Sequence, residues 1–112
     1  FVQGAGWLTI EEVIWKLNGE LTTHSPSTYK IPAVNDMPEK FNVAIFKNLN
    51  KENVINKSKT TGEPPLMLAM SVFFAIKDAI ASVGNYTKIP ELNAPATPEA
   101  ILLSIKDLKN KL

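Results

Sequence analysis

The sequence predicts a small α+β domain, with about three helices packed on a small β-sheet. Two long stretches with helical spacing of apolar residues, 66–83 and 98–112, indicate the main helices. An alternating segment, 41–46, and an Asn-Gly pair at 18–19 indicate strands. A chain of 112 residues, 45% of them hydrophobic, has room for one domain with a modest core.

The first 23 residues predict a short helix and then a hairpin. Thr9 and Glu12 have the spacing of a capping box, and we place the end of the helix near Glu12. Residues 13–17 are mostly β-branched, aromatic or aliphatic, which is typical of a strand. Asn18-Gly19 is a strong turn signal, so it predicts a hairpin over residues 13–23.

The middle of the chain predicts irregular structure around one strand. Residues 24–40 contain three prolines, which favour an extended segment that covers a surface: Pro26, Pro32 and Pro38. Residues 41–46 alternate apolar with small or polar residues, as in a strand with one buried face. Residues 47–57 are rich in asparagine and lysine and predict a loop, with Val54-Ile55 as a candidate short strand.

The last half of the chain predicts two helices with clear boundaries. The first three turns of the 66–83 helix are apolar almost all round, which predicts burial on most sides. Gly84-Asn85 predicts its end, and residues 86–96 predict a loop. Thr97-Pro98-Glu99 supplies an N-cap, a first-turn proline and a first-turn acid. Four apolar residues then follow one helical face: Ile101, Ile105, Leu108 and Leu112.

Composition excludes several classes of function. The formal net charge is +1, and all twelve basic residues are lysines, so the guanidinium groups that read bases and phosphates are missing and no nucleic-acid partner is predicted. The chain has no cysteine, which excludes disulfides, zinc–thiolate sites and iron–sulfur clusters within it. His24 is the one histidine, so no metal ligand is predicted. The apolar run 66–76 is shorter than the roughly 20 residues that span a bilayer, so no membrane is predicted.

Other side chains receive structural interpretations. Adjacent residues on a helix do not face each other, so we interpret Glu11 and Glu12 as solvated capping residues rather than an acid–base pair. Tyr29 could line a pocket, but from the residues alone we interpret it as loop packing. The histidine at position 24 is interpreted as a solvent-facing loop residue. Six aromatic residues are expected in the core: Trp7, Trp15, Phe41, Phe46, Phe73 and Phe74.

Glu63 is the candidate for chemistry. Pro64 disfavours the helical conformation for Glu63, and Gly62 allows unusual backbone dihedrals or a close approach to a ligand. Pro65 suits the first turn of the helix that follows. From the residues alone, the favoured role of this carboxylate is to stabilise the helix dipole, worth about 0.3–1 kcal/mol. The helix dipole and desolvation would set its basicity in opposite directions.

Several blocks in order along the chain resemble the C-terminal part of the molybdenum-binding subunit of xanthine dehydrogenases and aldehyde oxidases, and xanthine dehydrogenase most. The blocks are Phe1-Val2-Gln3-Gly4, residues 26–33, Ser58-Lys59 with Gly62-Glu63-Pro64-Pro65-Leu66, residues 73–80, and Pro95-Ala96-Thr97-Pro98-Glu99. Thr60-Thr61 departs from the small apolar residues that are common in this family.

The resemblance implies a site and a reaction. Glu63 matches the general base of the family, which takes the proton from a molybdenum-bound hydroxyl during hydroxylation of an electron-poor carbon. The residues where the family's loop approaches the cofactor are Lys59, Thr60, Thr61 and Gly62. The implied cofactor is the molybdopterin–molybdenum cofactor, and the implied substrates are purines such as hypoxanthine and xanthine. Aldehyde oxidisers share the motif, so an aldehyde substrate stays open.

The resemblance also implies a place within a larger enzyme. Residues 1–112 would be a single C-terminal subdomain of the large subunit of a molybdenum hydroxylase, with the upstream remainder absent. The implied partners are the rest of the molybdenum subunit and the iron–sulfur and FAD domains or subunits, in the cytoplasm. The 112 residues alone are expected to be inactive. A non-catalytic folding or interaction module of the same ancestry, or a plain α+β domain in which Glu63 is only a cap, remain alternatives.

Overall fold

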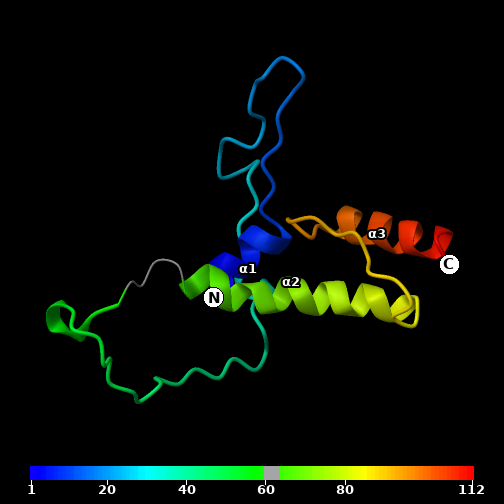
Figure 1. Cartoon of the computed structure of the whole chain (residues 1–112). Helices are drawn as coiled ribbons and strands as arrows, with labels where there is room; N and C mark the ends of the chain where they lie inside the picture. Colours follow the sequence, from blue (N-terminus) through cyan, green and yellow to red (C-terminus); the bar gives the residue numbers. More distant parts are fainter. Residues whose placement is uncertain (60–63) are drawn as a thin grey trace.

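The structure is a helical fragment, and the predicted α+β class is wrong. The computed structural model describes residues 1–59 and 64–112. Its elements in chain order are α1 (Val2–Thr9), η1 (Val34–Asp36), η2 (Ile55–Lys57), α2 (Pro64–Val83) and α3 (Pro98–Asn110). Across these described ranges there are three α-helices and two 3-10 turns but no β-strand and no small sheet (Figure 1). An isolated antiparallel bridge joins Trp15 and Leu21.

The predicted hairpin turns back on itself but forms no strands. Lys16 N donates to Glu20 O at 2.9 Å, and Thr22 N donates to Ile14 O at 2.9 Å. Gly19 has a φ of 84°, the left-handed conformation that the Asn-Gly signal predicts. The paired region is too short for a ladder, and a two-stranded hairpin without a packed face is marginal. The turn was therefore predictable and the strands were not.

The predicted strand at 41–46 is also wrong. These residues are extended in the structure, but no neighbouring segment among the described residues pairs with them. The side chains of Val43 and Ile45 are 76% and 91% exposed. A strand needs a partner for its N–H and C=O groups, and alternation in the sequence does not supply one.

Helix α1 ends earlier than predicted. The hydroxyl of Thr9 donates to Ala5 O at 2.6 Å, so Thr9 belongs to the last turn of a helix and does not cap the start of one. The amides of Ile10 and Glu11 both donate to Gly6 O at 2.9 Å and close the helix there. The capping-box spacing of Thr9 and Glu12 was therefore misleading.

Helices α2 and α3 begin and end close to where the sequence predicts. The hydroxyl of Thr97 accepts a hydrogen bond from Ala100 N at 3.2 Å, and Pro98 is the first residue of α3. Asn85 and Tyr86 have φ values of 49° and 58°, which reverse the chain after α2. A Cβ on Gly84 would lie 3.3 Å from the side chain of Leu108, so the ends of the two helices meet.

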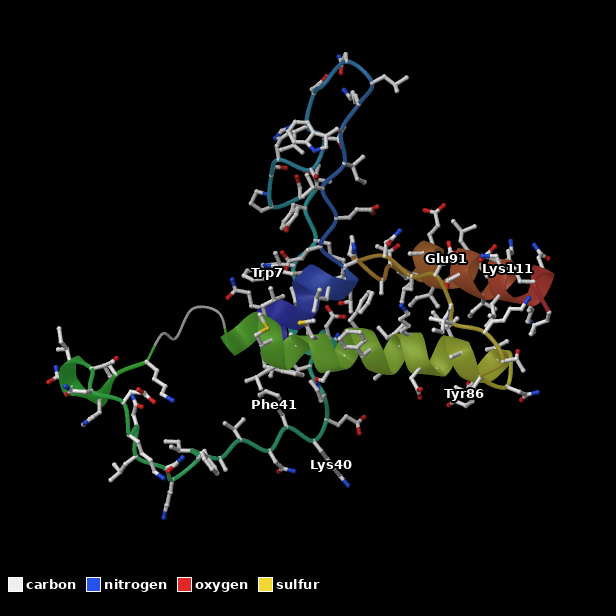
Figure 2. All side chains as sticks on the ribbon, in the orientation of Figure 1. Trp7, Lys40, Phe41, Tyr86, Glu91 and Lys111 are labelled. Carbon is white, nitrogen blue, oxygen red and sulfur yellow. The ribbon has the colours of Figure 1, made fainter. Side chains whose placement is uncertain are left out.

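The core lies between α2, α3 and the segment that joins them. Ile80, Leu92, Ala96 and Leu108 form the buried cluster, with Phe73, Ile76, Ile101 and Ile105 packed against it. Residues 84–97 run back along α2, so α2 and α3 point in the same direction (Figure 1). Figure 2 shows Glu91 and Lys111 beside α3, where Lys111 Nζ lies 3.1 Å from Glu91 Oε1 and 2.6 Å from Asp107 Oδ2.

Much of the chain lies outside this core. The radius of gyration is 18.1 Å, against about 13 Å for a compact domain of this length. The segments between residues 12 and 28 and between residues 42 and 59 project away from the helices (Figure 1). Of the aromatic residues expected in the core, Phe73 packs on it, while Trp7, Trp15, Phe41, Phe46 and Phe74 are 43–83% exposed. The prediction that α2 is buried on most sides is wrong for the chain by itself, because Met67 and Leu68 are each 63% exposed.

Candidate functional site

Helix α1 is the place where distant parts of the chain meet. Tyr29 Oη donates to Glu11 Oε2 at 2.7 Å, which ties the segment around residue 29 to the end of α1. Glu11 is 8% exposed, so this carboxylate is buried. A buried carboxylate requires a hydrogen-bond donor, and Tyr29 supplies one. The earlier interpretation of Glu11 as a solvated capping residue is therefore wrong.

Gly6 allows the second contact between α1 and this segment. A Cβ placed on Gly6 would lie 2.5 Å from Pro32 Cγ and 2.6 Å from Glu11 Oε1. Real Cβ atoms do not approach other atoms this closely, so only glycine permits the observed packing. The block at the start of the chain and the block at residues 26–33 are held together by this close approach and by the Glu11–Tyr29 hydrogen bond.

A third block reaches α1 from the end of the chain. Ala96 N donates to Leu8 O at 2.7 Å, just before α3 begins. Helix α1 itself lies on the first half of α2, where Val72 joins α1 residues around a cavity of about 250 Å³. Figure 1 shows α1 next to the N-terminal half of α2 and α3 next to its C-terminal half. Segments that are more than 80 residues apart in sequence therefore meet near the start of α2.

The hydrogen bond to Glu11 changes the acidity of Tyr29. The pKa of Tyr29 is raised above its ordinary value of 10.0, first because its hydroxyl donates to Glu11, and then through burial and the negative charge of Glu11. Loss of the proton would place two negative charges side by side. Tyr29 therefore stays a neutral donor at all physiological pH values.

A second cavity, of about 480 Å³, lies on the projecting segment. Its lining residues are Val13, Thr23, His24, Ser25, Pro26, Tyr29 and Ile31. Tyr29 therefore lines a pocket, the alternative to the loop packing that the residues alone favoured, and His24 is exposed. The hydroxyl of Ser25 hydrogen-bonds to the hydroxyls of Ser27 and Thr28, each at 3.0 Å, which is the pattern of a polar turn.

The predicted catalytic residue and most of the predicted cofactor residues lie outside the described residues. This applies to Glu63, Thr60, Thr61 and Gly62. Helix α2 begins at Pro64, so the residue that follows Glu63 is the first residue of the helix on which α1 packs. The position of α2 is therefore known up to the edge of the candidate site.

Lys59 is described and exposed. It lines an open hollow of about 650 Å³ in the loop at 46–59, together with Phe46, Asn48, Leu49, Asn50, Lys51, Glu52 and Lys57. Lys57 Nζ donates to Glu52 O at 3.1 Å, and Asn50 Nδ2 donates to Lys57 O at 3.1 Å. Three ammonium groups around one hollow suit an anionic group. This hollow belongs to the projecting loop and is separate from the contacts around α1 (Figure 1).

The described ranges contain no group of three or more histidine, cysteine, aspartate or glutamate residues that could hold a metal ion. They therefore supply no metal-ligand set of their own. Glu11 is the residue of this region that the sequence did not reveal. Its partner is 18 residues away, so no local spacing pattern could have indicated the pair.

Comparison with known proteins finds one family model and several long relatives. A family model described as a molybdopterin cofactor-binding domain matches residues 1–38, the part that contains α1 and the segment packed on it. A xanthine dehydrogenase/oxidase from Felis catus is 50% identical over 107 residues, covering 90% of this chain and 8% of the relative. A xanthine dehydrogenase from Dictyostelium discoideum is 46% identical over 110 residues, covering 96% of this chain and 8% of the relative.

A plant protein gives the same result. Xanthine dehydrogenase 1 from Arabidopsis thaliana is 43% identical over 117 aligned positions, covering 96% of this chain and 9% of the relative. The chain therefore spans less than a tenth of the length of the curated relatives that it matches.

Proposed function

The chain belongs to the xanthine dehydrogenase family, and we propose that it is the C-terminal part of the molybdenum-binding region of an enzyme that hydroxylates purines such as hypoxanthine and xanthine. The observation that carries the proposal is identity of 43–50% to xanthine dehydrogenases along 90% or more of the chain. In this proposal, residues 1–112 form one C-terminal subdomain, and the rest of the molybdenum subunit completes the site.

The cofactor is the molybdopterin–molybdenum cofactor, since residues 1–38 match a molybdopterin cofactor-binding domain. The described residues offer no cluster of metal ligands. The organic part of this cofactor supplies ligands to the metal. The protein residues therefore need to bind and orient the organic part rather than the metal. We assign the cofactor-approaching role to Lys59, Thr60, Thr61 and Gly62, with backbone N–H groups and the Lys59 ammonium as donors to anionic oxygens.

Glu63 is the general base in this proposal. When bound, the cofactor supplies the oxygen that is transferred to the substrate carbon and accepts the two electrons that leave it. The Glu63 carboxylate takes a proton from the attacking oxygen, which raises the nucleophilicity of that oxygen. Gly62 and Pro64 flank Glu63 in the sequence, and α2 starts at Pro64, the residue that follows Glu63.

The proposed partners are the rest of the molybdenum subunit and the iron–sulfur and FAD domains or subunits. They would receive the electrons after each turnover, in a cytoplasmic enzyme. The relatives are more than ten times longer than this chain, and the substrate clamp and most of the cofactor contacts are assigned to that additional length. We therefore expect the purified 112-residue chain to show no xanthine oxidation with or without added cofactor.

The decisive test uses Glu63→Gln and Glu63→Ala in the full-length enzyme. General-base catalysis contributes about 10²–10⁴-fold, so kcat for xanthine should fall by a factor in that range. Molybdenum and molybdopterin content, measured by elemental analysis and by fluorescence of the released pterin, should stay at wild-type levels. Activity within about threefold of wild type would remove Glu63 from the base role.

Glu99 provides a matched control for this experiment. Glu99 is an acidic residue in the first turn of α3, so its charge interacts favourably with the helix dipole. The cap-only alternative assigns the same role to Glu63. Glu99→Ala should leave kcat unchanged and lower stability by about 0.3–1 kcal/mol. If Glu63→Ala behaves like Glu99→Ala, the cap-only alternative is correct.

An aldehyde substrate is the second candidate, because aldehyde oxidisers share the Gly-Glu-Pro-Pro motif. Steady-state kinetics of the full-length enzyme with xanthine and with a simple aromatic aldehyde separate the two. A higher kcat/KM for the purine supports the proposal. A higher kcat/KM for the aldehyde would assign the chain to an aldehyde hydroxylase while leaving the role of Glu63 intact.

A further inference from the structure

One face of α2 is apolar and uncovered. We call it the outward face, and it consists of Met67, Leu68, Ser71, Phe74 and Ala75. Met67 and Leu68 are each 63% exposed and Phe74 is 54% exposed. Ser71 and Ala75 are exposed as well. On a helical wheel these five residues share one side of the first three turns.

The opposite side of α2 is already occupied by the rest of the chain. Ala69 is fully buried and Ile80 is 2% exposed, and Phe73 and Ile76 pack on the core formed with α3. Helix α1 lies on the same helix near Val72. Figure 1 shows α1 and α3 along one side of α2. The uncovered residues are therefore those that α1 and α3 leave free.

The outward face carries no charge and offers few polar groups. No lysine, arginine, aspartate or glutamate occurs between Leu66 and Ile76. The hydroxyl of Ser71 donates to Leu68 O at 2.7 Å, so it is satisfied within the helix. Ser71 and Ala75 carry small side chains between the larger Leu68 and Phe74, a pattern that suits packing against apolar side chains from another helix or loop.

The surface of the chain is larger than that of a self-contained protein. The accessible surface is 9134 Å², whereas a folded monomer of 12.3 kDa exposes about 6,100 Å². The excess of about 3,000 Å² is shared between the exposed face of α2 and the projecting segments, and its size is that of a permanent interface and not of a transient contact. The relatives contain more than ten times as much polypeptide, and this chain aligns with only 8–9% of it. The covering surface is therefore expected within the same polypeptide.

A lipid bilayer is a poorer occupant. Among the described helices, α2 is the one that is long and apolar enough to cross a membrane, judged by length and composition. Helices α1 and α3 pack on one of its sides, and the buried core at Ile80 and Leu108 depends on that contact. A helix at the centre of a larger soluble enzyme has the same composition.

We propose that the outward face of α2 is an intrasubunit interface, buried in the full-length enzyme against an uncharged apolar segment of the same polypeptide from outside residues 1–112. This inference rests on family membership and on exposed surface, and it does not depend on the catalytic role of Glu63. The interface holds α2 from the side opposite α1, and it fixes the helix that begins directly after the proposed base.

Photo-crosslinking in the full-length enzyme tests the proposal. Phe74→p-benzoylphenylalanine replaces one aromatic side chain by a larger one on the outward face. After irradiation and digestion, mass spectrometry should find the peptide that contains position 74 linked to a peptide from outside residues 1–112, at the mass of a single polypeptide on a denaturing gel. Links to a second copy at doubled mass, links to added phosphatidylcholine vesicles, or no protein link would each overturn the proposal.

Tyr86→p-benzoylphenylalanine is the matched control. Tyr86 is 62% exposed and follows the end of α2, but it lies outside the outward face. Its crosslinking yield to segments outside residues 1–112 should be at least about fivefold lower than that of position 74, because no interface is assigned to it. Equal yields at the two positions would show that position 74 is not a preferred contact and would overturn the proposal.

Thiol protection gives a readout that does not need a bulky substitution. Ser71→Cys in the full-length enzyme should react with a maleimide at least about tenfold more slowly in the native state than after unfolding, because the interface covers the outward face. The rate should not change on dilution, which separates an intrasubunit contact from association of two copies. A native rate equal to the unfolded rate would overturn the proposal even if Glu63 proves to be the base.

Discussion

Replacement of Gly6 by alanine should loosen the junction between α1 and the segment around Pro32. The added Cβ would lie 2.5 Å from Pro32 Cγ, 2.7 Å from Pro32 Cδ and 2.6 Å from Glu11 Oε1. Carbon atoms pack best at about 3.5–4.0 Å, so the ring of Pro32 has to move by about 1 Å. Glu11 must move too, although Tyr29 holds its other oxygen at 2.7 Å.

Two opposing terms set the magnitude. Overpacking typically costs about 1–3 kcal/mol, and the upper end applies here because three atoms are too close and the proline ring is rigid. Alanine is about 1 kcal/mol better than glycine inside a helix, and Gly6 lies in the middle of α1. The net effect of Gly6→Ala is therefore a loss of about 2 kcal/mol in the free energy of unfolding.

A double-mutant cycle with Pro32→Ala measures this clash directly. Pro32→Ala removes both ring carbons, so Gly6→Ala should cost at least about 1 kcal/mol less in the Pro32→Ala background than in the wild type. Urea unfolding of the four variants gives the four free energies. In the full-length enzyme, Gly6→Ala should lower molybdopterin content, with partial recovery in the double mutant.

Two other glycines serve as controls. Gly84→Ala places its Cβ 3.3 Å from the Leu108 side chain, which can yield by a few tenths of an ångström, so its effect should be small. Gly19→Ala meets no atom within 4 Å, but φ is 84°, so a loss of about 1–2 kcal/mol comes from backbone strain. Stabilisation by Gly6→Ala, or equal costs in both Pro32 backgrounds, would refute the reasoning.

Two further predictions concern the core and the pH dependence. Leu108→Ala removes the largest fully buried side chain and should lower the unfolding free energy by about 2–5 kcal/mol. Leu102 lies on the same helix and is 51% exposed, so Leu102→Ala should change this free energy by about 0.5 kcal/mol or less. Urea unfolding compares the two variants. The pKa of Tyr29 is raised above 10.0, mainly because Tyr29 donates to Glu11, so its contribution is fully present below pH 10 and is lost as pH rises through the raised pKa. Thermal melts between pH 7 and 12 should show this loss in the wild type and not in Tyr29→Phe; equal alkaline profiles would contradict it.

Local signals predicted the helices because local interactions determine them. The Thr97 hydroxyl caps the start of α3, and the ring of Pro98 fixes the backbone of its first residue. Both effects involve only residues within one helical turn. The apolar spacing of Ile101, Ile105 and Leu108 identified the face that packs on α2. Leu112 continues the pattern but is 63% exposed, because the helix has ended by then.

The strands and the buried pair were not predictable because each depends on a distant partner. Alternation at 41–46 describes the side that a strand would bury, but pairing requires another segment with free N–H and C=O groups. Glu11 is buried because Tyr29 reaches it across 18 residues, and Gly6 matters because Pro32 lies against it. None of these contacts leaves a periodic signature. The candidate base was indicated by a motif, and its geometry falls outside the described residues.

The same reasoning explains why the sequence misjudged the burial of α2. An apolar surface all round a helix predicts that every side is covered, and it does not say by what. In this chain α1 and α3 cover one side, and Met67, Leu68 and Phe74 remain exposed. If the prediction from the sequence holds for the whole enzyme, the missing cover must come from polypeptide outside residues 1–112. The exposed residues that contradict the predicted burial of α2 are then the same residues that form the proposed interface.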